Sequence, residues 1–258
     1  MISTLVTIFL ILIIFFANEK IKNFNFLSNY QGYKHQKFSG FKKIPLSGGL
    51  FLISSCLILF YINNFNHLLF LFLFFIFCVG FVSDINLLSS PKLRFLIQFI
   101  IVVFFVILLD IKIHQTKFHL IDIFLDNLYF KYFFSVFCLL ILINGSNFID
   151  GVNTLLIGYF LSVILIVLIL IDQYDLNFET QNLKIIFYIL LILLVFNFFE
   201  KFFCGDGGSY VISLIAGYYL IELSNLDLFI SPYFIACLLW YPAYECLFSM
   251  IRKKFKKY

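Results

Sequence analysis

The sequence predicts an all-α membrane protein with about nine transmembrane helices. Of its 258 residues, 63% are hydrophobic and only 12% are charged, whereas soluble domains carry roughly 45 to 50% apolar and about 25% charged residues. Its apolar runs approach the roughly 20 residues that a helix needs to cross a hydrocarbon core of about 30 Å. They lack the alternation of apolar and polar residues that is typical of barrel strands. Helices are then the remaining structure that can hydrogen-bond all backbone N–H and C=O groups within lipid.

The expected helices follow one another without a soluble domain, a linker or an internal repeat between them. They cover residues 2–18, 47–62, 67–83, 93–111, 132–147, 154–172, 185–199, 208–224 and 231–251. The first segment has no basic start and no small-residue cleavage site, so we interpret it as a retained anchor and not as a signal peptide. Residues 1–258 are therefore predicted to form a single membrane domain.

The distribution of lysine and arginine predicts the orientation. Cytoplasmic loops of membrane proteins are enriched in these residues. With the N-terminus outside, only Lys112, Lys117, Lys131 and Lys184 of the 18 basic residues lie outside, so we expect an external N-terminus and a cytoplasmic C-terminus. The longest external loop, residues 112–131, alternates in part and is expected to hold a short hairpin.

Cysteine and histidine do not indicate a metal site of their own. The six cysteines show no CxxC spacing and the four histidines form no HExxH or similar pattern, so zinc and disulfides are not predicted. The expected partners are the lipid bilayer and small molecules, and no nucleic acid.

Three polar stretches interrupt the apolar chain at helix ends, and the predicted orientation puts all three on the cytoplasmic side. They are GFVSDINLLSSPKLRFLIQ from Gly80, NGSNFIDGVNTLL from Asn144 and FFCGDGGSY from Phe202. Carboxylates at membrane depth are costly unless they pair, reach water or bind ions. Each stretch carries one, Asp84, Asp150 or Asp206, so together they predict a site.

Three converging carboxylates raise one another's pKa unless a divalent cation or a basic partner is bound. Hard oxygen ligands favour Mg²⁺, with Mn²⁺ as an alternative. Gly205, Gly207 and Gly208 would let the backbone approach a phosphate closely, and Ser209 is expected to open a helix whose N-terminus favours an anion.

Side chains beside the aspartates are candidates for substrate binding, and each has a structural alternative. Asn144 and Asn147 are three residues apart, so both amides can face one side of a helix end and bind a nucleotide. Lys92 and Arg94 are either phosphate contacts or ordinary positive-inside anchors, and Pro91 before them is typical of a helix start. A single aspartate of this kind is more often a cap or a solvated loop residue.

At these residues the sequence resembles the bacterial polyprenyl-phosphate N-acetylhexosamine-1-phosphate transferases, the WecA, TagO and MraY group. The first polar stretch is similar to the family's GxxDDxxxLSPKxRLLxQ segment, the second to NxxNxxDGxDGL and the third to FxGDxGS. Residues 34–50, KHQKFSGFKKIPLSGGL, resemble the family's first cytoplasmic loop. The resemblance runs from about Lys34 to the C-terminus.

The resemblance implies that a lipid phosphate oxygen attacks the β-phosphorus of a UDP-sugar, releasing UMP and beginning cell-surface glycan synthesis. Asp206 would be the principal magnesium ligand, Asp150 would help to organise the metal, and Asn147 would contact the nucleotide. Asp84 would be a base or would position the lipid phosphate. Gly205 would lie against the substrate, and cations would offset phosphate repulsion: Lys37, Lys42, Lys43, Lys92 and Arg94.

Three departures from the family pattern leave alternatives open. Ser83 stands where the family has the first Asp of its pair, and Asn153 and Thr154 stand where Asp-Gly is common. The family's C-terminal His-containing loop and last helix are not expected before Tyr258. A transporter, a lipid-binding protein and a catalytically impaired relative remain alternatives to an enzyme of the bacterial cytoplasmic (inner) membrane with its site facing the cytoplasm, and the sequence leaves a homodimer open.

Overall fold

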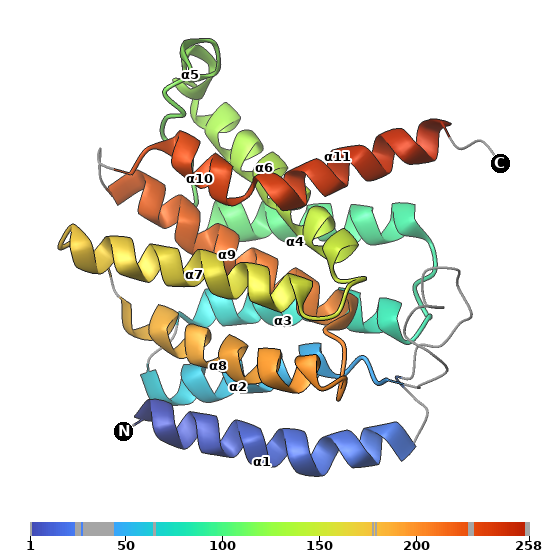
Figure 1. Ribbon diagram of the computed structural model, residues 1–258. Helices are drawn as coiled ribbons and strands as arrows, with labels where there is room; N and C mark the ends of the chain where they lie inside the picture. Colours follow the sequence, from blue (N-terminus) through green and yellow to red (C-terminus); the bar gives the residue numbers. More distant parts are fainter. Residues whose placement is uncertain are drawn as a thin grey trace.

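The computed structural model describes residues 2–23, 27, 44–63, 66–176, 178, 180–226 and 230–255. Within these ranges the chain forms a bundle of eleven α-helices (Figure 1), so the predicted all-α class is confirmed. The helices are α1 (Ile2–Asn23), α2 (Gly48–Asn63), α3 (His67–Asp84), α4 (Pro91–Leu108), α5 (His119–Leu125), α6 (Leu128–Ile149), α7 (Leu155–Gln173), α8 (Thr180–Phe198), α9 (Gly205–Leu226), α10 (Pro232–Leu238) and α11 (Trp240–Phe255).

Five of the described helices, α3, α4, α6, α7 and α8, are long and apolar enough to cross a membrane. A sixth span results if α10 and α11 are counted as one broken span. Large apolar side chains such as Leu96 and Phe104 on α4 are more than half exposed, which suits a surface covered by lipid. The described residues therefore have the character of a membrane protein, whereas nine spans and the orientation of the termini stay predictions.

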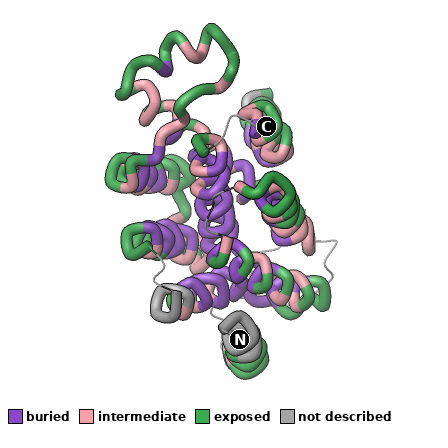
Figure 2. Tube along the Cα trace, turned by 90° about the vertical axis from the view of Figure 1, so that its left-hand side faces the viewer, coloured by how far each residue is buried: buried purple, intermediate pink, exposed green. Residues whose placement is uncertain are grey.

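Helix α9 lies at the centre of the bundle and contacts α2, α3, α6, α7 and α10. Figure 2 shows the buried residues gathered along this centre. Small residues let neighbouring backbones approach closely: a Cβ on Gly49 of α2 would lie 2.6 Å from the amide nitrogen of Gly208. The Ser213 hydroxyl donates to the Ser209 carbonyl of its own helix at 2.7 Å, so this polar group is buried without being left unpaired.

The last expected segment, residues 231–251, is two helices and not one. Helices α10 and α11 are bent by 61° at Leu239. Pro242 has no N–H to donate to the Leu238 carbonyl four residues earlier, and its ring crowds that carbonyl. The hydroxyl of Tyr159 on α7 donates to the Leu238 carbonyl instead. Proline therefore breaks the helix, and a neighbouring helix pairs the freed carbonyl.

The hairpin expected in residues 112–131 is also wrong, because this fully described loop contains the short helix α5 and no strand. Asp122 in the first turn of α5 accepts hydrogen bonds from the amide and the hydroxyl of Thr116, both at 2.7 Å. This carboxylate fixes the entry into a helix. The alternation read from the sequence covered too few residues to distinguish a strand from a single helical turn.

Candidate functional site

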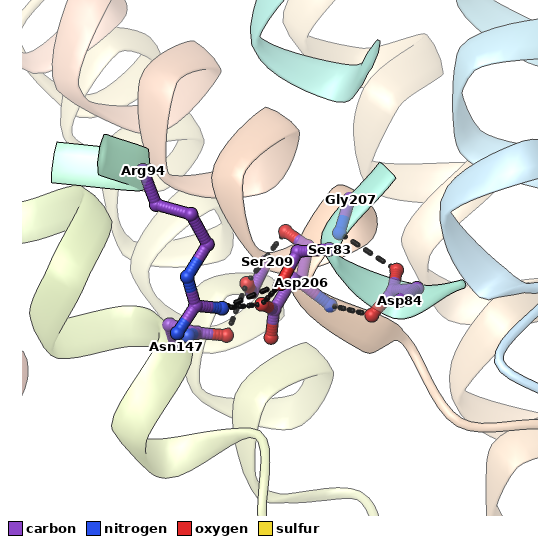
Figure 3. Close-up of polar contacts among 7 residues, drawn as sticks. All are labelled: Ser83, Asp84, Arg94, Asn147, Asp206, Gly207 and Ser209. Carbon is purple, nitrogen blue, oxygen red and sulfur yellow. Dashed lines mark hydrogen bonds and ion pairs between the residues drawn. The ribbon is translucent and has the colours of Figure 1, made fainter. Parts of the chain in front are cut away.

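Four helix ends meet at one end of the bundle: the C-terminal ends of α3 and α6 and the N-terminal ends of α4 and α9 (Figure 3). The turn after α3 leads to α4, which begins at Pro91 after an extended Ser90. Proline suits the first helical position because that residue needs no intrahelical N–H donor, so the helix-start interpretation of Pro91 is confirmed. Arg94 follows in the first turn of α4 and reaches toward α9.

Asp84, the last residue of α3, caps α9 from outside that helix. Its Oδ1 accepts the amide N–H of Asp206 at 2.8 Å, and its Oδ2 accepts that of Gly207 at 3.1 Å. The first amides of a helix have no partner within it and attract negative charge. A carboxylate from another helix therefore holds the N-terminus of α9 in place.

Gly205 starts α9 in the left-handed region, with φ of +73°. A Cβ at this position would lie 2.7 Å from Oδ2 of Asp84. Glycine is required here both for the backbone conformation and for the close approach of the capping carboxylate. Its predicted contact with substrate stays a prediction.

Asp206 lies in the first turn of α9 and takes part in a closed group of three polar side chains. The Arg94 guanidinium donates from Nη1 to Oδ2 of Asp206 at 2.5 Å, and the Ser83 hydroxyl donates to the same oxygen at 2.7 Å. Arg94 Nη1 also donates to the Ser83 oxygen at 2.5 Å. Arg94 is thus an ion-pair partner of a predicted catalytic carboxylate, and Ser83 connects the two.

The two asparagines of α6 differ in their surroundings. Asn147 Oδ1 lies 3.1 Å from the Ser209 hydroxyl of α9, which is also 3.0 Å from the Asp206 carbonyl. Asn144 instead donates from Nδ2 to the Leu140 carbonyl of its own helix at 2.9 Å. The structure therefore connects Asn147, and not Asn144, to the helix that carries Asp206.

Asp150 directly follows α6 as its C-cap residue. Burial raises the pKa of its carboxyl well above the ordinary value, the charges of Asp84 and Asp206 raise it further, and the Gly205 amide opposes this rise. These mutual effects place the three predicted aspartates at one site. Among the described residues, Arg94 is the cation that forms an ion pair within this group, so a further cation would be needed to keep all three carboxyl groups ionised.

The carboxyl oxygens of the site can be compared with the ligands that a divalent cation requires. Among the described residues, no three His, Cys, Asp or Glu side chains are arranged to hold a metal ion. Mg²⁺ commonly uses only one or two protein carboxylates and completes its shell with water and substrate phosphates. Asp206 and Asp150 fit such a site, because their carboxyl groups lie close enough to interact and a bound cation would favour their ionised forms.

One positioning residue was not identified from the sequence. Asn197, buried near the end of α8, accepts the Thr154 amide N–H and donates to the Phe202 carbonyl, both at 2.7 Å. It thereby joins the segment after Asp150 to the segment before Asp206. A lone asparagine in the apolar run LLVFNFF was the signal that was available.

The structure corrects the predicted start of one helix and describes only some of the predicted basic residues. Helix α9 begins at Gly205 and not at Ser209, and Gly207 and Gly208 are buried within it, whereas their approach to a phosphate stays a prediction. Lys92 is exposed and forms no ion pair with a described residue. Lys43, with Lys37 and Lys42, lies outside the described residues.

Exposed apolar side chains on the long helices and a group of polar side chains at one end of the bundle indicate a membrane protein with a candidate polar site. Comparison with family models then gives a match to glycosyl transferase family 4 over residues 67–224, more than half of the chain. The chain belongs to this family, that of the polyprenyl-phosphate hexosamine-1-phosphate transferases, so the predicted resemblance is confirmed. The matched range contains all three aspartates. A separate comparison with curated proteins finds no match to the chain.

Proposed function

We propose that this protein transfers a sugar 1-phosphate, from a UDP-N-acetylhexosamine, to polyprenyl phosphate and releases UMP. Membership of glycosyl transferase family 4 supports the transfer of a sugar phosphate. The single observation that carries the proposal to particular residues is the position of Asp206. It starts the central helix α9, pairs with Arg94, and lies close enough to Asp150 to affect its pKa.

The reaction is a displacement at phosphorus. An oxygen of the lipid phosphate forms a bond to the β-phosphorus of the donor, while the bond from this phosphorus to the bridging oxygen breaks and UMP leaves with that oxygen. A phosphate monoester has a second pKa near 6, so the attacking group is already ionised at neutral pH. The main barrier is then repulsion between phosphates, which positive groups offset.

The chain's own residues would divide the remaining work. Arg94 is suited to the donor's diphosphate, because a guanidinium can bind two phosphate oxygens at once. Asn147 would orient the nucleotide, and Asp84 would keep the N-terminus of α9, and with it Asp206, in position. Asp206 and Asp150 would hold Mg²⁺ or Mn²⁺, which when bound neutralises charge on the phosphates.

The proposed location is the bacterial cytoplasmic membrane, with the site facing the cytoplasm. The excess of lysine and arginine in the loops assigned to that side supports this orientation. UDP-sugars are water-soluble and would reach the site from the cytoplasm, whereas the polyprenyl chain would stay in the bilayer. The product would begin the synthesis of a cell-surface glycan.

The test uses the purified full chain in detergent with polyprenyl phosphate, Mg²⁺ and a panel of UDP-sugars, and follows UMP release. We expect release that requires both the lipid and the divalent cation, with the active sugar identified by the panel. Asp206→Asn should reduce turnover at least about a hundredfold, a loss comparable to that of one transition-state charge contact. Asp126→Asn, an exposed aspartate after α5, is the matched control and should remain active.

A folded protein that releases no UMP with any sugar of the panel would contradict the transferase proposal. Equal activity of Asp206→Asn and the native chain would show that the reaction does not depend on this site. Movement of the lipid or of ions across vesicles without UMP release would instead favour the transport alternative.

A further inference from the structure

Arg94, Ser83 and Asp206 form an arrangement that the proposed reaction does not explain by itself. A carboxylate expected to bind a divalent cation is already paired with a guanidinium, through the same oxygen that accepts the Ser83 hydroxyl. A guanidinium cannot be deprotonated under ordinary conditions. Its positive charge therefore opposes any second cation on Asp206.

We propose that Arg94 is an exchangeable counter-ion, which occupies Asp206 when the site is empty and moves to the donor's diphosphate when the divalent cation binds. The inference rests on the proposed function for the identity of the donor and of the cation. It concerns a different property, namely the order in which charges are exchanged. Between reaction cycles, the positive charge of Arg94 would reduce the repulsion among the three carboxylates.

The geometry permits such an exchange. The side chains of Arg94 and Asp206 are 24% and 22% exposed, so water can reach the pair when it separates. Arg94 extends from the first turn of α4 to the first turn of α9 (Figure 3). Its anchoring helix therefore need not move when the side chain turns toward a ligand.

Ser83 sets the strength of the pairing. Its hydroxyl accepts from Arg94 and donates to Asp206, so it holds the two groups together without adding charge. The aspartate found at this position in the family pattern would add a second negative charge beside Arg94 and hold it more strongly. In this chain the neutral Ser83 holds the guanidinium by a hydrogen bond alone. Release of Arg94 therefore costs less free energy than it would with an aspartate at this position.

The test measures Mn²⁺ binding to the purified full chain by electron paramagnetic resonance, in the absence of any sugar nucleotide. A neighbouring opposite charge changes the proton affinity of a carboxylate by about tenfold or more, and it should affect a competing cation in the same direction. We therefore expect Arg94→Gln to bind Mn²⁺ about tenfold more tightly than the native chain. Arg94→Lys keeps the positive charge but loses the planar guanidinium. Its Mn²⁺ affinity should therefore lie between those of the native chain and Arg94→Gln.

Lys92→Gln is the matched control, because it removes an equal charge two residues away from a side chain that pairs with no described residue. Its Mn²⁺ affinity should be close to that of the native chain. UDP should increase Mn²⁺ affinity in the native chain, since its diphosphate accepts the displaced Arg94. This increase should be several times smaller in Arg94→Gln.

The outcomes separate the two proposals. If folded Arg94→Gln and Arg94→Lys bind Mn²⁺ no more tightly than the native chain, Arg94 is not a competing counter-ion. If Arg94→Gln and Lys92→Gln gain affinity equally, the effect is that of net charge and the inference is wrong. If Asp206→Asn binds Mn²⁺ like the native chain, the metal site of the proposed function is wrong instead.

Discussion

Asp84 provides the most direct test of how the fold positions the site. Its two oxygens accept the amides of Asp206 and Gly207, so Asp84→Ala should release the N-terminus of α9. A buried amide left without its acceptor costs about 1 to 3 kcal/mol, and loss of a helix cap costs about 0.5 to 2 kcal/mol. We expect Asp84→Ala to lose about 2 to 4 kcal/mol, because partial exposure lets water replace part of the interaction.

Asp84→Asn should lose about half of this amount, since its single carbonyl oxygen can accept only one amide while its NH₂ group faces the other donor. At about 2 to 4 °C per kcal/mol for a chain of this size, the alanine variant should unfold roughly 5 to 15 °C lower. Hydrogen exchange measured by mass spectrometry on peptides covering residues 205–210 locates the effect, because the capped amides should lose protection. Asp126→Asn should change neither measurement.

The capping explanation is refuted if Asp84→Ala leaves both the unfolding temperature and the exchange of these amides unchanged. Should Asp84→Asn abolish turnover while the amides stay protected, Asp84 would act on the substrate directly. In that case its predicted role as a base or as a positioner of the lipid phosphate would be favoured.

Two further predictions concern buried amides. Asn197→Ala leaves the Thr154 N–H and the Phe202 carbonyl without their partner, which costs about 1 to 3 kcal/mol per group; the unfolding temperature and turnover should both fall. Its matched control is Asn182→Ala in the same helix, where Oδ1 has no partner among the described residues, and a loss of equal size there would contradict the assigned role. Gln98→Leu should keep or raise the unfolding temperature, because neither polar atom of this buried amide makes a hydrogen bond of normal geometry to a described residue, although the Tyr210 hydroxyl interacts with this side chain. A clear drop would show that the Tyr210 hydroxyl or a bound water is a stabilising partner of Gln98.

The general architecture follows from the sequence because the apolar runs are long enough to allow only helices in lipid. The expected segments 67–83, 132–147 and 154–172 lie within or close to α3, α6 and α7. The break at Leu239 could have been predicted from Pro242, because the effect of proline on the preceding turn is local. The hairpin failed because a few alternating residues do not distinguish a strand from a short helix.

The composition of the site was also accessible from the sequence, since ionisable groups in an apolar chain are few and costly. Asp84, Asp150 and Asp206 could be identified in this way, and the motifs around them indicated the family. The sequence could not decide between Asn144 and Asn147, because both lie at the same helix end and only the approach of Ser209 from α9 distinguishes them.

Tertiary structure alone decided which partner each polar group takes. Asp84 and Asp206 are 122 residues apart in the chain, and Arg94 and Asp206 are 112 apart. A hydrogen bond depends on distances and angles to within fractions of an ångström, and these are set by the packing of α3, α4 and α9. The sequence thus determined the membrane fold class and the set of candidate site residues, whereas the packing of helices made Asp84 a cap, Arg94 the ion-pair partner of Asp206 and Ser83 the residue that connects the two.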